Sequence, residues 1–191
     1  MDPLFGIMTA FGLSASAGLN AYIPLLVVGV IAHYTDKITL IPPYDALSNP
    51  WVLIVIGILL IIEMLADKIP AVNHVNDIIQ TGIRPAAGAI IFAASAHVIT
   101  NIHPLIAILC GLLVSGSVHF VKSAAVRPAV TATTGGAANV PVSIAEDVVA
   151  TGVSLLSIIV PVLVAVLLIV LLAFIIWLLW RRAKRKGHSA S

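Results

Sequence analysis

Hydrophobic positions along the chain form long uncharged blocks that are separated by short polar segments. A membrane-spanning helix needs about 20 consecutive, mostly apolar residues. The clear blocks are residues 4–32, 50–66, 85–102, 104–121 and 148–180. The pattern predicts an all-α, polytopic membrane helical bundle in which these blocks are passes.

The stretch 128–145 is ambiguous, because it is uncharged but rich in Thr, Gly and Asn. If it crosses, there are about six passes and both termini share one side. Nine of the ten Lys and Arg residues then lie on that side, with only Lys37 opposite, as the positive-inside rule favours. We therefore expect six passes with cytoplasmic N- and C-termini, while a re-entrant 128–145 segment would give a similar charge count.

Composition supports this class. The 191 residues are 60% hydrophobic and 9% charged, against about 25% charged in an ordinary soluble domain. No Lys or Arg precedes the first block, so we expect a retained membrane helix rather than a cleaved signal. We expect a single transmembrane domain over residues 1–180 and a basic cytoplasmic tail over 181–191. Residues 33–50 are expected as an outer loop, and 67–85 as a short amphipathic helix at the inner surface.

Two similar small-residue stretches interrupt the apolar pattern: GLSASAGLNAYIP at 12–24 and AVTATTGGAANVP at 129–141. Gly/Pro-broken helices in corresponding positions of two halves are typical of a transporter's binding site. The expected substrate-binding residues of this polar midplane centre are Ser14, Ser16, Asn20, Thr131, Thr133, Thr134, Gly135 and Asn139. The alternative is that small residues simply let helices pack closely.

Further similarities between segments of the chain suggest internal repeats. At an offset of 54, Pro50 aligns with Pro104 and Lys68 with Lys122. Arg-Pro-Ala occurs at both Arg84 and Arg127. The symmetry of such repeats, parallel or inverted, stays open.

Ionisable residues within or beside the apolar blocks are the second functional signal, because a charge in the bilayer centre is costly. The candidate coupling or ion-binding acids are Glu63, Asp67, Glu146 and Asp147. Their candidate charge partners are Lys68, Arg84, Lys122 and Arg127. The alternative for these residues is solvation at the ends of the spans.

Enzyme signatures are sparse. The sequence lacks a G-x-S-x-G elbow, a Walker loop and an HExxH motif, although an intramembrane hydrolase using Glu63 or Asp67 with His74 or His119 stays open. The same residues with Asp77 could ligate a divalent metal, so a metal site also stays open. No cofactor is expected. The only basic cluster, RRAKRK, follows the last block and fits anionic lipid better than nucleic acid.

Three segments carry a family resemblance: SASAGLNAYIPLL, EMLADKIPAVNHVNDIIQTGIRPAAGA and HFVKSAAVRPAVTATTGGAANVPVSIAEDVVA. They resemble a family of small bacterial integral-membrane proteins classified as domain of unknown function 4126. The resemblance implies one compact helical domain in the bacterial cytoplasmic (inner) membrane, and it supplies no activity.

The leading functional hypothesis is a secondary transporter or lipid flippase, whose partners would be the lipid bilayer and a small ion or anionic lipid substrate. A membrane-embedded enzyme and a non-catalytic scaffold or partner subunit are the alternatives. A homo-oligomer is compatible with any of the three.

Overall fold

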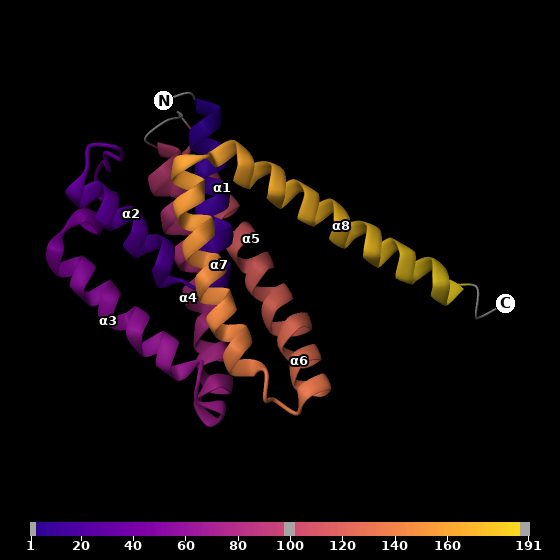
Figure 1. Ribbon diagram of the computed structural model, residues 1–191. Helices are drawn as coiled ribbons and strands as arrows, with labels where there is room; N and C mark the ends of the chain where they lie inside the picture. The colour runs from indigo at the N-terminus through magenta and orange to yellow at the C-terminus, as the bar shows by residue number, and fades with distance from the viewer. Residues whose placement is uncertain (1–2, 98–101, 188–191) are drawn as a thin grey trace.

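The computed structural model describes residues 3–97 and 102–187, and within these ranges every element is helical (Figure 1). The all-α prediction is confirmed for this part of the chain. The elements in order are α1 (Pro3–Leu19), α2 (Tyr22–Tyr34), the 3-10 helix η1 (Tyr44–Ser48), α3 (Pro50–Ala66), α4 (Pro70–His97), α5 (Pro104–Val121), the π-helix η2 (Lys122–Val126), α6 (Arg127–Thr134), α7 (Asn139–Ile159) and α8 (Pro161–Gly187).

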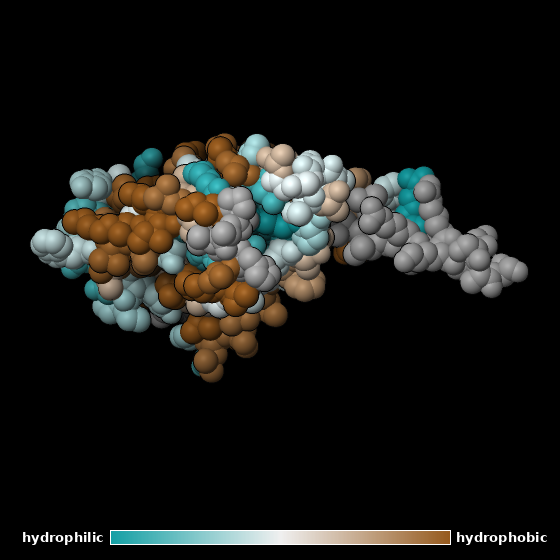
Figure 2. Space-filling model, turned by 90° about the horizontal axis from the view of Figure 1, so that it is seen from below, coloured by the Kyte–Doolittle hydropathy of each residue, from teal (hydrophilic) through white to brown (hydrophobic). Residues whose placement is uncertain are grey.

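Three helical stretches are long and apolar enough to cross a membrane: Val75–Ser95, Pro104–Thr134 and Asn139–Ile159. Shorter apolar helices cover Leu4–Leu19, Tyr22–Tyr34, Pro50–Ala66 and Pro161–Phe174. Large hydrophobic side chains face outward, and in the view from below they cover much of the rim between patches of hydrophilic residues (Figure 2). Three helices thus have the length and apolarity that a membrane span requires, whereas the number of passes stays a prediction.

Helices α3 and α5 begin with the same kind of side-chain cap. The Asn49 side chain accepts a hydrogen bond from the Trp51 N–H at 2.9 Å, and that of His103 accepts one from the Leu105 N–H at 3.3 Å. A proline follows each cap, at the first turn where its missing N–H costs no helical bond. The starts of α3 and α5 thus match at the offset of 54, although an internal repeat is still a prediction.

The expected first pass over 4–32 is wrong as a single helix, because the chain reverses between Leu19 and Tyr22. α1 runs antiparallel to α4, since Phe11 meets Phe92 near one end and Ser14 meets Gly88 further along. Figure 1 shows α2 turning back from the end of α1 and α3 running down beside it. The first apolar block is therefore a hairpin-like pair of helices rather than one continuous helix.

The separate inner helix over 67–85 and the pass beginning at residue 85 are also wrong. One helix, α4, runs from Pro70 to His97 with Pro85 inside it. A proline removes one backbone hydrogen bond and brings a bulky ring. Here the ring faces Gly116 on α5, where even an added methyl group would lie at an ordinary contact distance of 3.7 Å from the ring, so the neighbouring helix does not crowd the proline.

The 128–145 stretch is not a span of its own. It contains α6, a turn at Gly135 (φ 62°) and Gly136 (φ 90°), and the first turns of α7. Left-handed glycines commonly end helices in this way. The expected final pass over 148–180 is likewise divided, because α7 ends at Ile159 and Pro161 opens α8, which extends away from the bundle past residue 180 (Figure 1).

α1 lies at the centre of the bundle, where its small residues allow close packing. Ser14 Oγ donates to the carbonyl oxygens of Gly88 (3.1 Å) and Gly111 (2.9 Å), on α4 and α5. Ser16 Oγ donates to the Ala150 carbonyl on α7 at 2.8 Å. A methyl group at Gly18 would lie 2.6 Å from the Ser115 carbonyl oxygen. The small-residue alternative thus accounts for most of the 12–19 segment.

Candidate functional site

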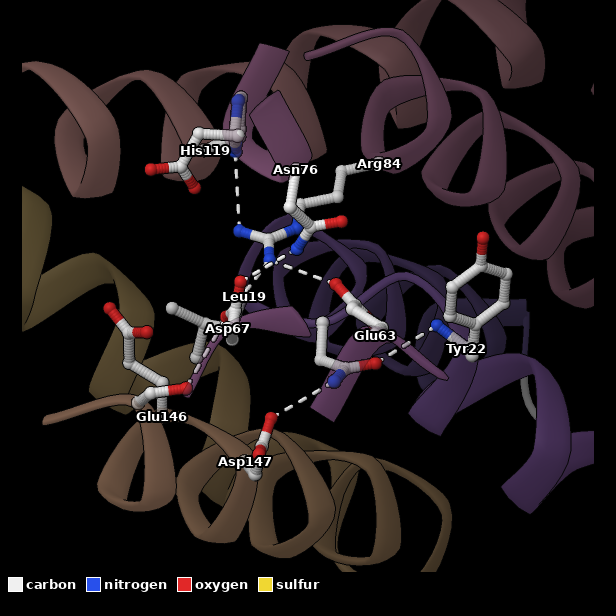
Figure 3. A network of polar contacts seen from close by, with 12 residues as sticks. Leu19, Tyr22, Glu63, Asp67, Asn76, Arg84, His119, Glu146 and Asp147 are labelled. Atoms are coloured by element: carbon white, nitrogen blue, oxygen red, sulfur yellow. Dashed lines mark hydrogen bonds and ion pairs between the residues drawn. The ribbon is translucent and has the colours of Figure 1, made fainter. Parts of the chain in front are cut away.

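Charged side chains from α3 and the residue after it, from α4, from the α5–α6 stretch and from α7 meet beside the end of α1, and all except the partly buried Glu146 are buried (Figure 3). We call this group the charge cluster; its members are Glu63, Asp67, Arg84, Lys122, Arg127 and Glu146. The helical rise of about 1.5 Å per residue puts Arg84 about 20 Å from the His97 end of α4, and Lys122 about 27 Å from the Pro104 end of α5. The cluster therefore lies far from the end of the bundle at which α4 ends and α5 begins.

Arg84 is the most buried member, with none of its side chain exposed. Its Nη2 donates to Glu63 Oε1 at 2.9 Å and lies 3.8 Å from Asp67 Oδ2. Its Nη1 lies 3.3 Å from His119 Nδ1. Glu63 is 2% exposed, and its Oε2 has no hydrogen-bond partner within the described residues. One guanidinium is thus shared by two carboxylates and an imidazole.

Asp67 follows the last residue of α3 and collects donors from three directions. Its Oδ1 accepts from Asn76 Nδ2 at 2.7 Å. Its Oδ2 accepts from Arg127 Nη2 at 2.9 Å and from Ser143 Oγ at 3.3 Å, and Lys122 Nζ lies 3.9 Å away. Asp67 is therefore the acid through which the three cations of the cluster are linked.

The electrostatics of Asp67 reflect these neighbours. Burial by itself would raise the pKa of this carboxyl, but the charges of Lys122, Arg127 and Arg84 and the hydrogen bond from Asn76 outweigh it. The net result is a pKa below the ordinary value for aspartate. Asp67 is consequently ionised at neutral pH.

Lys122 joins the cluster to the end of α1. Its Nζ lies 2.8 Å from Glu146 Oε2 and donates to the Leu19 carbonyl at 3.0 Å. Leu19 is the last residue of α1, where carbonyls lack intrahelical donors and cations are favourable. Lys122 opens the π-helix η2, and the Arg127 N–H that closes it bonds to the Lys122 carbonyl. Arg127 Nη2 also reaches Glu146 Oε2 at 3.4 Å.

Asn20 holds the break between α1 and α2. Its Oδ1 accepts from the N–H groups of Tyr22 (3.0 Å) and Ile23 (3.2 Å), which are unsatisfied donors at the start of α2. Its Nδ2 donates to Asp147 Oδ1 at 2.9 Å. The helix break and the acids of α7 therefore form one connected structure.

The structure brings some of the predicted site residues together and leaves others apart. Asn20, Asp147 and the charge cluster meet, while Lys68 is half-buried and takes part in none of the ion pairs among the described residues. The second broken stretch is elsewhere. Thr131, Thr133, Thr134 and Gly135 are exposed near the α6–α7 turn; Thr131 bonds to Asn139, and Thr133 and Thr134 bond to their own helix.

Sequence reasoning missed Asn76, Gln80, Ser115 and Ser143, all of which are buried polar residues. A signal existed for two of them, because Asn76, Gln80 and Arg84 follow one another at intervals of four. Residues spaced in this way share one face of a helix. Because Arg84 is itself a candidate site residue, this spacing could have added Asn76 and Gln80 to the prediction.

The metal and hydrolase hypotheses gain no support from the geometry. Among the described residues, no group of three or more His, Cys, Asp and Glu side chains is arranged to hold a metal ion. His119 contacts Arg84 and Thr81 rather than Glu63 or Asp67. The side chain of His74 lies outside the described residues.

Comparison with known proteins identifies a family. Neither the curated proteins nor the solved structures contain a match to this chain. One family model matches residues 7–181, nearly all of the described chain, and the resemblance noted in the sequence is thereby confirmed. The chain belongs to the family described as Domain of unknown function (DUF4126).

Proposed function

We propose that this protein is a secondary transporter or lipid flippase in which the charge cluster is the coupling site. The observation that supports this most directly is the sharing of ions within the cluster. Arg84 lies between Glu63 and Asp67, and Lys122 between Glu146 and the Leu19 carbonyl. Ionisable residues inside membrane helices are functional candidates by default, because they are costly to retain.

Because its charged groups share partners, the cluster can adopt two arrangements in which the same side chains are paired differently. If Glu63 takes up a proton, its attraction for Arg84 falls, and the guanidinium is drawn towards Asp67, 3.8 Å away. The partners of Asp67 come from α4, α6 and α7. A proton on one acid therefore changes the forces between several helices, which is what coupling a proton or cation to transport requires.

The arrangement also supports a revised orientation. α2 turns back from α1, so we place the start of α1 and Lys37 on one side of the membrane. Lys68, Arg127 and the basic residues after Trp180 are placed on the other, which the positive-inside rule makes cytoplasmic. This replaces the expectation that both termini are cytoplasmic with an outer N-terminus and a cytoplasmic C-terminus.

The test is transport by purified protein in liposomes of phosphatidylethanolamine and phosphatidylglycerol, under an imposed pH gradient. Uptake of small cations, anions and amines, and movement of fluorescent headgroup-labelled lipids, are compared for wild type and Glu63→Gln. Asp45→Asn, which makes the same change at an exposed carboxylate in η1, is the matched control.

We expect gradient-dependent flux in wild type and in Asp45→Asn, and uncoupled or absent flux in Glu63→Gln. Folded wild-type protein that moves none of these classes would contradict the proposal. That outcome would favour the non-catalytic scaffold. In a scaffold, the ion pairs of the charge cluster would serve only to hold the helices together.

A further inference from the structure

A groove of about 320 Å³ opens at the surface between α2, α3 and α7. Its lining residues are Ile23, Leu60, Met64, Asp147, Val148 and Thr151. The volume is at the lower end of the range for small-molecule sites. Apart from Asp147 and Thr151, the lining is aliphatic or thioether, so the groove suits an alkyl chain.

Asp147 differs from the acids of the charge cluster. Its residue is 8% exposed, and Oδ1 is held by the Asn20 amide at 2.9 Å. Its Oδ2 is buried and has no hydrogen-bond partner among the described residues. Whereas Glu63, Asp67 and Glu146 pair with cations within 4.0 Å, the described part of the chain offers Asp147 no such ion pair. A buried acceptor of this kind is expensive to leave unsatisfied.

We propose that this groove binds a primary alkylammonium, a single-chain amphiphile with a protonated amine. On binding, the Asp147 side chain turns its buried Oδ2 towards the groove that the residue lines and accepts a hydrogen bond from the ammonium group, and the alkyl chain lies along Ile23, Leu60 and Met64. An N–H donor and a positive charge together satisfy the carboxylate better than either does alone. The open side of the groove, beside the 66% exposed Val148, admits the chain from the lipid.

Charge complementarity argues against an anionic headgroup here. Arg84, Lys122 and Arg127 are each engaged by carboxylates of the cluster, and none of them lines the groove. The assignment names a substrate class and so rests on the proposed transport function. Binding can nevertheless be measured without flux, which keeps the two claims separable.

The experiment is equilibrium dialysis of tritiated octylamine against the protein in phosphatidylcholine nanodiscs at pH 7.5, with empty nanodiscs subtracted. Octanol, octanoate and methylammonium serve as competitors. We expect saturable binding that octanol and octanoate displace poorly and that methylammonium does not displace. Asp147→Asn should weaken octylamine binding about tenfold or more, the usual contribution of a charged hydrogen bond. Asp45→Asn, with the same charge change on an exposed residue, should bind as wild type does.

A second variant guards against a folding defect in Asp147→Asn. Leu60→Trp keeps the carboxylate and fills the groove from α3, where Leu60 is half-buried. It should also abolish binding. Equal affinity for octylamine and octanol, equal competition by methylammonium, or unchanged binding in either variant would overturn the proposal. Asp147-dependent binding without any flux would leave the groove assignment intact and count against transport, and flux of another substrate without octylamine binding would do the reverse.

Discussion

Replacing Arg84 by Met should strongly destabilise the fold. The change removes a fully buried guanidinium, 2.9 Å from Glu63 and 3.8 Å from Asp67, and leaves these acids with less compensation. Breaking a buried ion pair from one side costs about 3 to 5 kcal/mol. For a chain of this size, that loss lowers the melting temperature by roughly 6 to 20 °C. Thermal unfolding in detergent, followed by circular dichroism at 222 nm, measures it.

The double variant Glu63→Met/Arg84→Met separates lost pairing from lost packing. Replacing both partners of a buried pair by apolar residues is often neutral, because neither charge is then left unpaired. We therefore expect the double variant to regain most of the melting temperature. Lys68→Met is the control, since Lys68 forms none of the described ion pairs of the cluster. The reasoning is refuted if Arg84→Met melts at the wild-type temperature, or if the double variant melts at a lower temperature than Arg84→Met.

Three further outcomes follow from the contacts. Asn20→Ala removes two caps of α2 and the bond to Asp147, so urea denaturation should show a loss of about 1 to 3 kcal/mol. Gly18→Ala should lower the melting temperature because its methyl group meets α5, whereas Gly57→Ala, with nothing within 4 Å, should raise it slightly. Asp67 has a lowered folded-state pKa, so its stabilisation is present above about pH 4, the unfolded value, and is lost as the pH falls through the folded pKa. A pH series of melting temperatures should therefore decline more steeply on the acid side for wild type than for Asp67→Asn.

Charge and apolarity made much of the site predictable. Glu63 stands out because it interrupts a block that is otherwise uncharged, and Arg84 and Lys122 stand out because they lie directly beside such blocks; charged residues in these positions rarely face lipid. Their mutual arrangement was not predictable, because it depends on which helices are neighbours. The hydroxyls of Ser14 and Ser16 were assigned to a ligand, yet they bond to carbonyls of adjacent helices.

The predicted helix boundaries are wrong at the places where a single residue decides whether the helix continues or the chain turns. Pro85 is expected to begin a helix, but α4 continues through it from Pro70 to His97. Asn20 sits in an apolar block that is long enough to cross a bilayer, and its side chain nevertheless satisfies the first N–H groups of a new helix. Hydropathy carries no information on either choice, because both alternatives bury the same apolar side chains.

The π-helix at Lys122–Val126 has a consequence for the helical phase of the long α5–α6 rod. In a regular α-helix, residues five apart diverge by about 140°, whereas the i→i+5 bond from the Arg127 N–H to the Lys122 carbonyl aligns these two cations. The segment therefore behaves as an α-helix that has absorbed one extra residue. Losing Ala124 or Ala125, both exposed, would restore the ordinary winding with the two cations still in phase. Gaining a residue there would turn Arg127 by about 100° out of phase, so we expect this stretch to tolerate the loss of one residue better than the gain of one.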